Sequence, residues 1–288
     1  MAGEHTPTLR RRELAARLRA LRHRAGLNIE GVARELQCSP TKISRIETGR
    51  RGVILRDVRE LCRLYQVSAA EQENLMALAR ESKERTWWQG YEIDATFRTL
   101  IGLESAATAI ADYQPIVIPG LLQTPEYARA ILHGSGVPRT EQAIDEQVTL
   151  RTTRQLILDR PDPPYVSFII DEAVIHRLIG GRDVMRRQLD ALVTATMRPQ
   201  VSLQVLDYDA GAHPALPGNF TIVEIEGSAA ASIVFVEGHQ GDFYLEGVAD
   251  LRRYRRVFDR LRSIALSPQK SLDFIVTARD KIGPSGAS

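Results

Sequence analysis

Two short helical patterns separated by only three residues limit the fold of this chain more than any other feature. Apolar residues recur at helical spacing over residues 29–36 and again over residues 40–48. Ser39 can cap the second helix, and Pro40 stands at its first position, where the missing N–H costs nothing. With the small Ala33 at the centre of the first helix, the pattern predicts a helix-turn-helix.

Three further helices complete a predicted all-α domain around this pair. Leucines recur at helical spacing within residues 10–25, and a glycine in the left-handed conformation is expected to end that helix. A fourth helix is expected over residues 56–65. Ser68 and Glu71 form a capping box that opens a fifth. The pattern therefore predicts five helices in a single small domain.

Charge is distributed unevenly along the chain. Residues 1–65 hold 15 Lys and Arg against 7 Asp and Glu, a net charge of +8, whereas the remaining residues carry −6. A basic module joined to an acidic one predicts that only the first meets a polyanion such as nucleic acid. Arginines on a solvated helix surface would give the same count, so the helical motif decides between the two interpretations.

The stretch GLNIEGVARELQCSPTKISRIETGRRGV resembles the lambda-repressor/Cro-like class often called the Xre family. The resemblance implies a lambda-repressor-like fold, binding to double-stranded operator DNA, and an ion pair between Glu47 and an arginine of the first helix, by position Arg22. The chain departs from the family at Ile29. Many members place Gln or Thr at this position, where the side chain contacts the DNA backbone. The residues at the family's spacing are Gly26, Leu27, Ala33, Leu36, Ile43, Ile46, Glu47 and Gly49.

The geometry of a helix-turn-helix assigns DNA contacts to the start of the second helix of the pair. That helix lies in the major groove with its N-terminal residues toward the base edges. Lys42 or Arg45 then reads guanine, and the methyl group of Thr41 meets that of thymine, with Ser44 next to them. Lys42 has two alternatives, an ion pair with Glu47 or a free ammonium group.

Phosphate contacts are expected from residues at the ends of these helices. Asn28 and Ser39 stand at helix N-termini, which suit phosphate. Arg50 and Arg51 follow the second helix directly and suit phosphate as well. In the alternative interpretation Ser39 is only a cap, and both arginines are solvated.

The pattern changes beyond residue 80. Adjacent Trp87 and Trp88 are expensive to expose, which favours a docking segment between two domains over a platform that stacks nucleic-acid bases. We therefore predict a disordered tail at 1–9, a helix-turn-helix DNA-binding domain at 10–80, a linker and docking segment at 81–95, an α+β regulatory and dimerisation domain at 96–280 and a disordered tail at 281–288.

The second domain mixes helical and strand-like patterns. Helices are expected over residues 96–111, 141–160, 184–197 and 248–266, with another opened by Thr124 and Pro125. A short extended run covers 113–120, and strands are expected over 165–170, 201–206, 219–225, 232–236 and 242–245. The turns between the late strands are too short for helical crossovers, so the fold class is α+β, with a mixed or antiparallel sheet and flanking helices.

Segments such as VIPGLLQTPEYARAIL, FIIDEAVIHRLIGG and RRYRRVFDRLRSIALSP resemble the C-terminal region of the WhiJ-like regulators of streptomycetes and their relatives. The resemblance covers residues 10–280. It implies a regulator that often works with a small acidic partner protein encoded nearby, in an arrangement likened to toxin–antitoxin pairs. It implies no catalytic residues.

Candidate catalytic groups exist, but simpler roles are available for them. Asp171 and Glu172 follow a strand and could form a general base or half a metal site. They also stand where a helix beginning at Ala173 needs caps, and His213 and His239 stand in turns. The sequence contains no nucleophile elbow, HExxH motif, phosphate-binding glycine loop or dinucleotide fingerprint. We therefore expect no enzyme activity, no cofactor and no metal site.

A pocket that senses a small-molecule effector is the more credible role for the sheet. Its expected lining is His213, Phe220, Glu237 and Tyr244. A homodimer is also expected, because one recognition helix covers few base pairs and two half-sites lie about 34 Å apart. The apolar repeat over residues 251–265 supplies either a short seam for that dimer or core packing.

The compartment and the function follow from these observations. Cys38 and Cys62 are expected to be reduced thiols, and the sequence has neither a secretory signal nor an apolar run of about 18 residues. We therefore predict a cytoplasmic, nucleoid-associated, sequence-specific transcriptional regulator whose second domain dimerises and senses a ligand or a partner, without membrane contact. The alternative is an antitoxin-like interaction protein that sequesters a small partner and uses the helix-turn-helix for autoregulation.

Overall fold

The computed structural model describes residues 7–49, 52–84, 86–226, 232–238 and 241–283, and these fall into two compact units. The helical unit holds the described residues up to Gly90 together with Arg98–Ala106. The sheet unit holds Tyr91–Phe97, Ala107–Glu226 and the described residues from Ser232 onward. The α+β class predicted from the sequence is confirmed, because the first unit is helical and the second is built on a mixed sheet.

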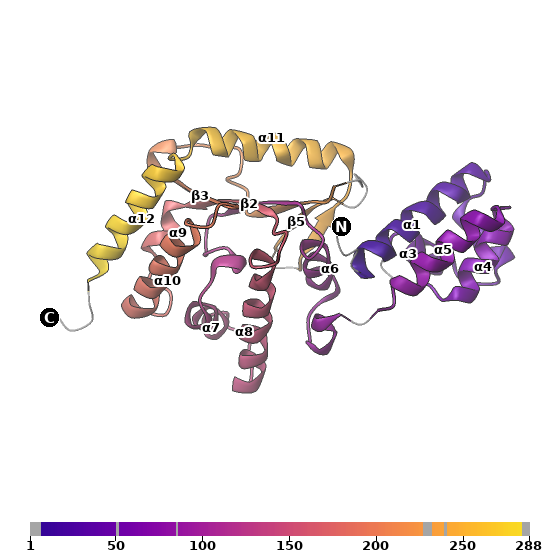
Figure 1. Ribbon diagram of the computed structural model, residues 1–288, viewed down its shortest axis with the longest axis horizontal. Coiled ribbons are helices and arrows are strands. Elements are labelled where there is room, and N and C mark those ends of the chain that lie inside the picture. Colours follow the sequence, from indigo (N-terminus) through magenta and orange to yellow (C-terminus); the bar gives the residue numbers. More distant parts are fainter. Residues whose placement is uncertain (1–6, 50–51, 85, 227–231, 239–240, 284–288) are drawn as a thin grey trace. The chain divides into compact units, whose positions relative to one another are not determined.

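The helical unit consists of short helices connected by tight turns (Figure 1). The first helix begins at Pro7, inside the tail predicted for residues 1–9, because Thr8 and Leu9 are buried and extend its inner face. The elements are α1 (Pro7–Arg24), α2 (Ile29–Glu35), α3 (Pro40–Glu47), α4 (Leu55–Leu64), α5 (Ala69–Glu81), a 3-10 turn (Trp87–Gly90) and α6 (Ala95–Glu104), of which the residues from Arg98 belong to this unit.

One apolar core holds α1 to α5 together. Leu18, Val32 and Ile43 from the first three helices are almost fully buried in it. Val58 and Leu75 add α4 and α5 to the same core. Burying each such side chain contributes about 1.5–3 kcal/mol, so the apolar spacing that predicts these helices also holds them against one another.

The helix α6 is shorter than the one predicted over residues 96–111. It ends at Glu104, and Ala109–Gln114 form the strand β1 instead. A strand forms here because β1 is hydrogen-bonded to a neighbouring strand on each side, which a local helical pattern does not reveal. The extended run predicted at 113–120 is therefore a strand only in its first residues.

The sheet unit is built on six strands in the order β3-β2-β1-β4-β5-β6. β1, β2 and β3 are parallel neighbours, whereas β4 joins β1 antiparallel and β5 and β6 continue antiparallel. β1 therefore lies where the sheet changes from parallel to antiparallel pairing. The strands are β1 (Ala109–Gln114), β2 (Tyr165–Asp171), β3 (Val201–Leu206), β4 (Phe220–Glu224), β5 (Ile233–Val236) and β6 (Phe243–Leu245).

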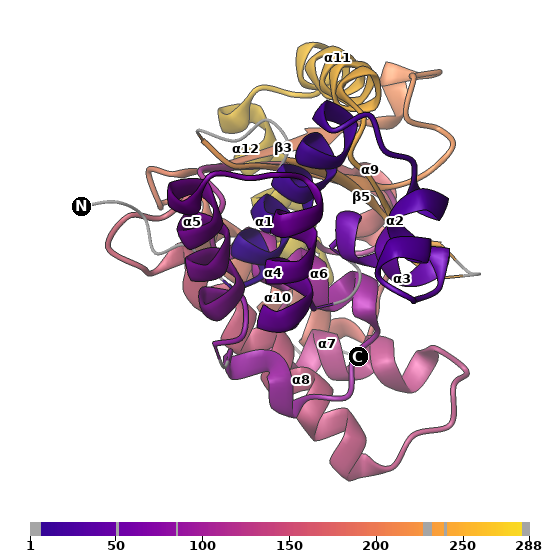
Figure 2. The same ribbon diagram turned by 90° about the vertical axis from the view of Figure 1, so that its right-hand side faces the viewer.

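Helices cover both faces of this sheet, as Figures 1 and 2 show. Parallel neighbours need crossover connections, and these are α7 and α8 between β1 and β2, and α9 and α10 between β2 and β3. The helices α7, α8 and α10 lie on one side of the sheet, and α11 lies on the other. The bounds are α7 (Pro125–Gly134), α8 (Glu141–Gln155), α9 (Glu172–His176), α10 (Arg182–Ala195), α11 (Val248–Ile264) and α12 (Pro268–Ile282).

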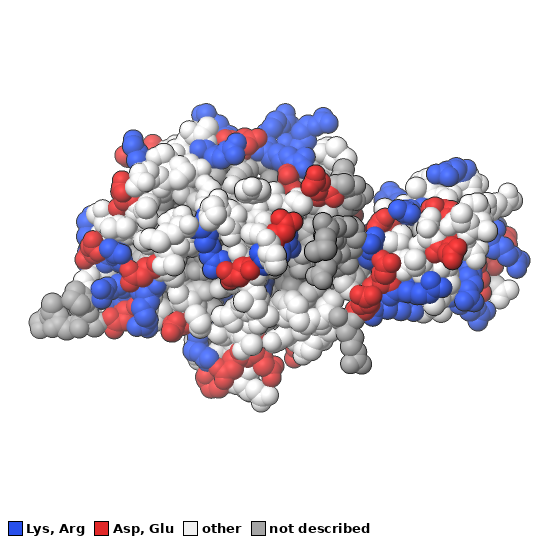
Figure 3. Space-filling model, in the orientation of Figure 1, with Lys and Arg blue, Asp and Glu red and all other residues white. Residues whose placement is uncertain are grey.

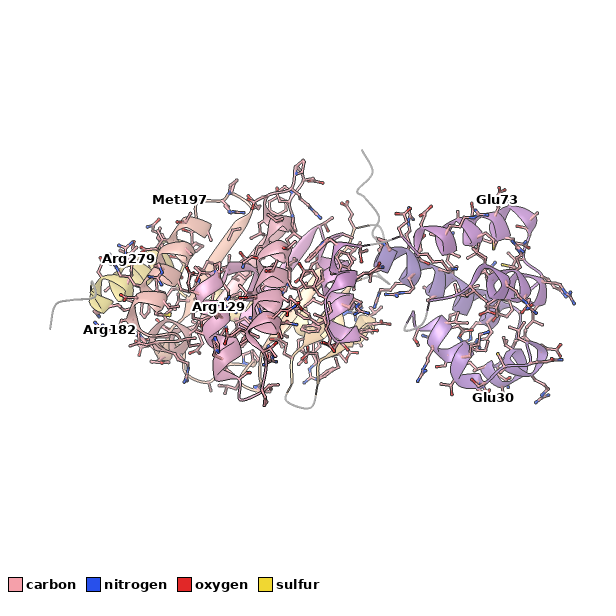
Figure 4. All side chains as sticks on the ribbon, turned by 90° about the horizontal axis from the view of Figure 1, so that it is seen from below. Glu30, Glu73, Arg129, Arg182, Met197 and Arg279 are labelled. Carbon is pink, nitrogen blue, oxygen red and sulfur yellow. The ribbon has the colours of Figure 1, made fainter. Side chains whose placement is uncertain are left out.

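The sequence patterns predict no helix at the position of α12, which covers the edge of β3 and runs into the predicted C-terminal tail. Val205 of β3 donates its N–H to Ser271 Oγ of α12 at 2.9 Å. Arg279 of α12 donates to Asp190 of α10 at 3.1 Å, and Arg182 of α10 donates to the last turn of α12 (Figure 4). An edge strand covered in this way is protected from pairing with another chain.

Alternation along the strands gives the two faces of the sheet different characters. On the α11 side, Tyr113 and Phe220 join an apolar core that includes Phe258 of the helix. On the other side, the adjacent residues Asp112 and Thr221 are paired across β1 and β4, and both are buried. One face is therefore apolar at this point, and the other is polar.

The apolar repeat of residues 251–265 packs against the first of these faces. Leu251, Phe258 and Leu261 are buried in the core under α11, and Tyr254 is partly buried against it. The repeat is therefore core packing, the second of the two alternatives that the sequence left open, and it does not supply a free seam for a dimer.

Candidate nucleic-acid interface

Local hydrogen bonds at the helix ends build the helix-turn-helix. Gly26 (φ 68°) follows α1 in the left-handed region that favours glycine. Asn28 caps α2, because its Oδ1 accepts a hydrogen bond from Gly31 N at 2.7 Å. Ser39 caps α3, with its Oγ accepting from Lys42 N at 3.2 Å. The two caps fix where the helices begin, and hence which residues lie at the leading end of α3.

The recognition helix predicted from the sequence has one buried and one open side. Ile43 and Ile46 of α3 lie in the helical core. On the other side Thr41 and Arg45 are exposed, and Ser44 is half-buried. Arg45 forms no ion pair within the part of the chain that the structure describes, so its guanidinium group is available to a ligand.

Arg22 and Glu47 form a buried ion pair behind this open side. Arg22 Nε donates to Glu47 Oε1 at 2.8 Å and to Oε2 at 3.0 Å, and the two side chains are only 7% and 4% exposed. Arg22 also donates through Nη1 to Leu27 O at 2.7 Å. The hydrogen bond to Glu47 raises the pKa of Arg22. One guanidinium group thus joins α1, the turn before α2, and α3, which is the structural role that the resemblance implies.

Lys42 is held by α4 rather than by its own helix. Its Nζ donates to Asp57 Oδ1 at 2.9 Å, and the side chains of Lys42 and Asp57 are 28% and 13% exposed. Both alternatives considered from the sequence, a pair with Glu47 and a free ammonium group, are therefore wrong, because Glu47 is occupied by Arg22. The pair spans 15 residues, so no local pattern points to it.

The residues expected at phosphate groups divide into two sets. Asn28 and Ser39 are exposed and serve as helix caps, and their contact with phosphate stays a prediction. Arg50 and Arg51 lie outside the described residues. Ile29 packs against the helical core, so its side chain is engaged in apolar packing.

The tryptophans after α5 partly cover each other. Trp87 and Trp88 meet edge to face, with ring centroids 5.5 Å apart and ring planes at 90°. Trp88 is buried, whereas Trp87 is 41% exposed. Stacking of nucleic-acid bases needs an open ring face in a basic groove, and the buried ring of Trp88 offers none.

A cavity beside the sheet exists, but its lining differs from the predicted one. It has a volume of about 180 Å³, and Phe220 lines it. His213, Glu237 and Tyr244 do not line it. His213 lies in the adjoining loop and packs edge-on against Tyr113, with ring centroids 5.9 Å apart.

The pleat of the sheet explains why two of these residues lie elsewhere. Tyr244 of β6 pairs with Phe235 of β5, which pairs with Thr221 of β4. Paired residues point to the same side of a sheet and successive residues to opposite sides, so Tyr244 lies on the face opposite to that of Phe220. Glu237 follows β5 and is exposed. The prediction grouped residues by their position in late strands, without the register that separates them.

The opposite face holds a buried carboxyl group that the sequence analysis missed. Asp112 on β1 is 4% exposed, and its Oδ1 accepts hydrogen bonds from Gln114 Nε2 and Thr221 Oγ1, both at 3.0 Å. Burial raises the pKa of Asp112 to about 7, and the charge of Glu237 acts in the same direction, while the two hydrogen bonds and the charge of Arg154 lower it. Polar residues interrupt the apolar pattern of this strand, so no local pattern places this carboxyl group in a sheet.

The two acids weighed as catalytic groups have structural partners. Asp171 caps α9, with its Oδ1 accepting from the backbone of that helix at 2.9 Å. Glu172 accepts from Tyr208 N at 3.0 Å, and its other carboxylate oxygen lies 3.1 Å from His176 Nε2. Within the described residues, no group of three or more His, Cys, Asp and Glu side chains could hold a metal ion. His239 lies outside the described residues.

Comparison with known proteins supplies a family for each part of the chain. Residues 13–75 match the family described as "Helix-turn-helix domain", and residues 97–277, more than half of the chain, match the "Domain of unknown function (DUF5753)". Neither a curated protein nor a solved structure matches the chain. Among the helices that the structure describes, none has the length and apolar character needed to cross a membrane. The chain therefore belongs to the family described as "Domain of unknown function (DUF5753)", with a helix-turn-helix domain toward its N-terminus.

Proposed function

We propose that this chain is a sequence-specific transcriptional regulator of the Xre type that uses α3 as its recognition helix. The observation that carries the proposal is the arrangement of α3, whose residues Thr41 and Arg45 are exposed while the buried Arg22–Glu47 pair fixes the helix from behind. A helix that exposes one side in this way, from its first turn to its last, can enter a major groove. The net positive charge of residues 1–65 adds attraction to phosphate.

Arg45 is the residue best suited to read a base. Its guanidinium group can donate two hydrogen bonds to O6 and N7 of guanine. Thr41 lies one turn earlier on the helix and offers a methyl group to thymine. Lys42 can join them only by exchanging its ion pair with Asp57 for a contact to DNA.

A gel-shift titration with the DNA upstream of the chain's own gene tests this proposal. Arg45→Ala is expected to weaken specific binding by about 1–3 kcal/mol, while weak binding to unrelated DNA persists and falls steeply with salt. Arg80→Ala is the matched control, because it removes an exposed arginine from α5. Absence of a shifted band with the unchanged chain at low salt, or equal losses for the two variants, would overturn the proposal.

For the sheet unit we propose self-association and input from a ligand or a partner. One end of its sheet exposes Leu156, Tyr165 and Met197, at 61%, 74% and 78%. Two hydrogen bonds tie their segments together. Val166 N donates to Gln200 O at 2.8 Å, and Gln200 Nε2 donates to Leu158 O at 2.9 Å. Exposed apolar patches mark interaction sites, and a second copy would supply the second recognition helix that an operator with two half-sites needs.

Sedimentation equilibrium tests the assignment of this patch to a second copy. The unchanged chain is expected to be a dimer at micromolar concentration, and Tyr165→Glu is expected to be a monomer, because a charge would have to be buried in the interface. Tyr208→Glu changes a tyrosine that is 60% exposed elsewhere on the unit and is the control. An unchanged chain that stays monomeric would contradict the assignment.

The antitoxin-like alternative places a small partner protein on the same apolar patch. It predicts that the chain co-purifies with a small protein from native lysate and that Tyr165→Glu loses this partner while it still binds DNA. A chain that remains unpartnered in native lysate, yet dimerises through the patch, favours the first proposal.

In both proposals the chain works by binding and not by catalysis. The support is structural, because Asp171 and Glu172, the acids that follow β2, are engaged as a cap and as an acceptor for a backbone N–H. An activity that Asp171→Asn abolishes, in a variant that still binds DNA with unchanged affinity, would contradict this part of the proposal.

A further inference from the structure

The cavity on the α11 side of the sheet has a defined chemical character. Its volume is about 180 Å³, and its walls come from β4, the end of β5, α11 and the loop that precedes β4. Phe220, Val236 and Val257 give these walls apolar surface, together with Pro214 and Pro217 of the loop, and Asn219 adds polar surface at the rim. An apolar cavity of about 150 Å³ can hold benzene, so this cavity has room for one aromatic ring.

One wall of the cavity is aromatic and held in place. Phe220 and Tyr254 meet edge to face, with ring centroids 5.0 Å apart and ring planes at 67°. Tyr113 and Phe258 support Phe220, at 5.9 and 6.4 Å between ring centroids. Aromatic rings favour such edge-to-face and tilted contacts, so a planar ring in the cavity would extend an existing cluster.

The loop that closes the cavity is shaped by its own turns. Gly211 (φ 60°) and Gly218 (φ 152°) adopt backbone conformations that other residues rarely take. Between them, Leu216 N donates to His213 O at 3.3 Å, and Gly218 N donates to Ala215 O at 3.2 Å. A rim that is already folded loses little freedom when a ligand arrives, which favours binding.

Arg253 gives the cavity a positive charge. Among the described residues of the lining it alone is charged, and it forms no ion pair with another described residue. Its neighbour Arg255 is engaged by Glu224, at 2.6 Å. Lys and Arg side chains lie along α11 in Figure 3, with Asp and Glu side chains among them. Glu237 accepts a hydrogen bond from Asn219 at the rim, at 2.7 Å, so Arg253 is the group of the lining that can bind an anion. A guanidinium group holds a carboxylate through two parallel hydrogen bonds.

We propose that this cavity binds a small aromatic carboxylate, with its ring against Phe220 and Tyr254 and its carboxylate on Arg253. The volume of the cavity fits one ring, the aromatic rings of Phe220 and Tyr254 suit a planar body, and Arg253 suits one negative charge. A role of this ligand as an effector that changes DNA binding rests on the proposed function. Binding itself can be measured without DNA.

Isothermal titration of the full chain with benzoate, and with the neutral benzamide, tests the site directly. Saturable binding of benzoate is expected, and benzamide is expected to bind at least about tenfold more weakly, because it lacks the charge that Arg253 recognises. Absence of saturable benzoate binding, or equal affinity for the two probes, would overturn the proposal.

Three variants locate the binding within the molecule. Arg253→Gln should reduce the benzoate affinity at least about tenfold and remove the preference over benzamide. Arg260→Gln, an exposed arginine further along α11 and outside the lining, should leave both unchanged. Val257→Trp should fill the cavity and abolish binding of both probes. Benzoate binding that survives Val257→Trp, or that falls equally in the two arginine variants, would show that the cavity is not the site.

Circular dichroism shows whether Val257→Trp is still folded. This control is needed because an overfilled cavity can disturb α11. If that variant unfolds, the comparison between Arg253→Gln and Arg260→Gln decides alone. A gel-shift with and without benzoate then separates the two proposals. Benzoate binding together with unchanged DNA binding retains the site and removes the effector role, whereas failure of the DNA proposal leaves the calorimetric result intact.

Discussion

The two units bury charged groups in opposite ways. In the helical unit, Arg22 and Glu47 neutralise each other, and both side chains are more than nine-tenths buried. In the sheet unit, Asp112 is equally buried, but its hydrogen-bond donors are the neutral side chains of Gln114 and Thr221. The same degree of burial is therefore compensated by a hydrogen-bonded opposite charge in one unit. In the other it is compensated mainly by neutral dipoles, with a smaller contribution from the charge of Arg154.

The difference shows that the partner of a buried group decides its protonation state. The hydrogen bond from Arg22 to Glu47 raises the pKa of Arg22, so its charge is kept at all ordinary pH values. Burial raises the pKa of Asp112 to about 7, because two neutral donors offset only part of the cost of removing the carboxylate from water. We expect the charge of Arg22 to be kept over a wide pH range, and the sheet unit to respond near neutrality.

The largest expected effect comes from breaking the compensated pair. Glu47→Ala leaves the guanidinium group of Arg22 buried without a counter-charge, and loss of one member of such a pair costs about 3–5 kcal/mol. Urea unfolding followed by circular dichroism measures the loss. Glu60→Ala is the control, because it breaks the exposed pair with Arg56 and should change stability little. Similar small losses in both variants would show that burial of the Arg22–Glu47 pair is energetically unimportant.

The uncompensated carboxyl group should make stability depend on pH. The pKa of an unfolded aspartate is about 3.9, and that of Asp112 is about 7, so the folded chain binds the additional proton. The resulting stabilisation is complete below about pH 4 and is lost as the pH rises through 7. Asp112→Asn keeps an acceptor for Gln114 and Thr221 and cannot ionise. It should therefore lose less stability than the unchanged chain between pH 5 and pH 8.

Urea unfolding of both chains at these two pH values measures the difference. Each unit of pKa corresponds to about 1.4 kcal/mol. Between pH 5 and pH 8 the free energy of unfolding should therefore fall by a few kcal/mol more in the unchanged chain than in Asp112→Asn. Burial raises the pKa of Asp242 to about 6. Stability should therefore keep a smaller dependence on pH, of the same sign, in both chains. Parallel pH profiles for the two chains would contradict the assignment to Asp112.

The helical unit could largely be predicted from its sequence because its information is local. Asn28, Ser39 and Ser68 each cap a helix that begins at the next residue. The apolar spacing that marks each helix is also its buried face, and the resemblance to Xre proteins added the Arg22–Glu47 pair. The Lys42–Asp57 pair escaped prediction, since it joins two helices whose relative position no local pattern records.

The sheet unit was less predictable because its strands are defined by distant partners. Asp112 lies between Thr221 and Phe168, which are each more than fifty residues away in the chain. Polar side chains on one face of β1 therefore hid a strand that lies inside the sheet. The predicted pocket lining failed for the same reason, since only the register places Phe220 and Tyr244 on opposite faces.

A smaller effect is expected from removing one of the donors to the buried carboxyl group. Thr221→Val deletes the hydroxyl that donates to Asp112 Oδ1 at 3.0 Å, and loss of one such hydrogen bond costs about 0.5–1.5 kcal/mol. Because this hydrogen bond lowers the pKa of Asp112, the variant should titrate at a higher pH. Carbon-detected NMR of the aspartate carboxyl groups measures the shift. The resonance should be absent in a variant that also carries Asp112→Asn, and a titration that moves downward in Thr221→Val would contradict the cause assigned here.

The smallest effect on stability is expected from breaking the ion pair between Lys42 of α3 and Asp57 of α4. The same change should have a measurable effect on DNA binding. Asp57→Asn breaks the partly exposed pair with Lys42, which should cost less than about 1 kcal/mol. It also frees an ammonium group at the leading end of α3 and removes a negative charge that would repel phosphate. The affinity for DNA should rise, and the slope of its logarithm against the logarithm of salt concentration should steepen by about 1.

Two further variants show whether Lys42 itself carries this gain. Glu60→Gln removes a negative charge from the same helix without touching Lys42, and it should raise the affinity less. Lys42→Met combined with Asp57→Asn should return the salt slope to that of the unchanged chain, because no additional cation is then available to a phosphate. If Glu60→Gln matches Asp57→Asn, the gain reflects net charge alone and Lys42 does not reach the DNA. If only Asp57→Asn steepens the slope, the ion pair between Lys42 and Asp57 restrains DNA binding. The helical unit would then contain two kinds of ion pair. The partly exposed Lys42–Asp57 pair can exchange Asp57 for a phosphate, whereas the buried Arg22–Glu47 pair keeps its partners.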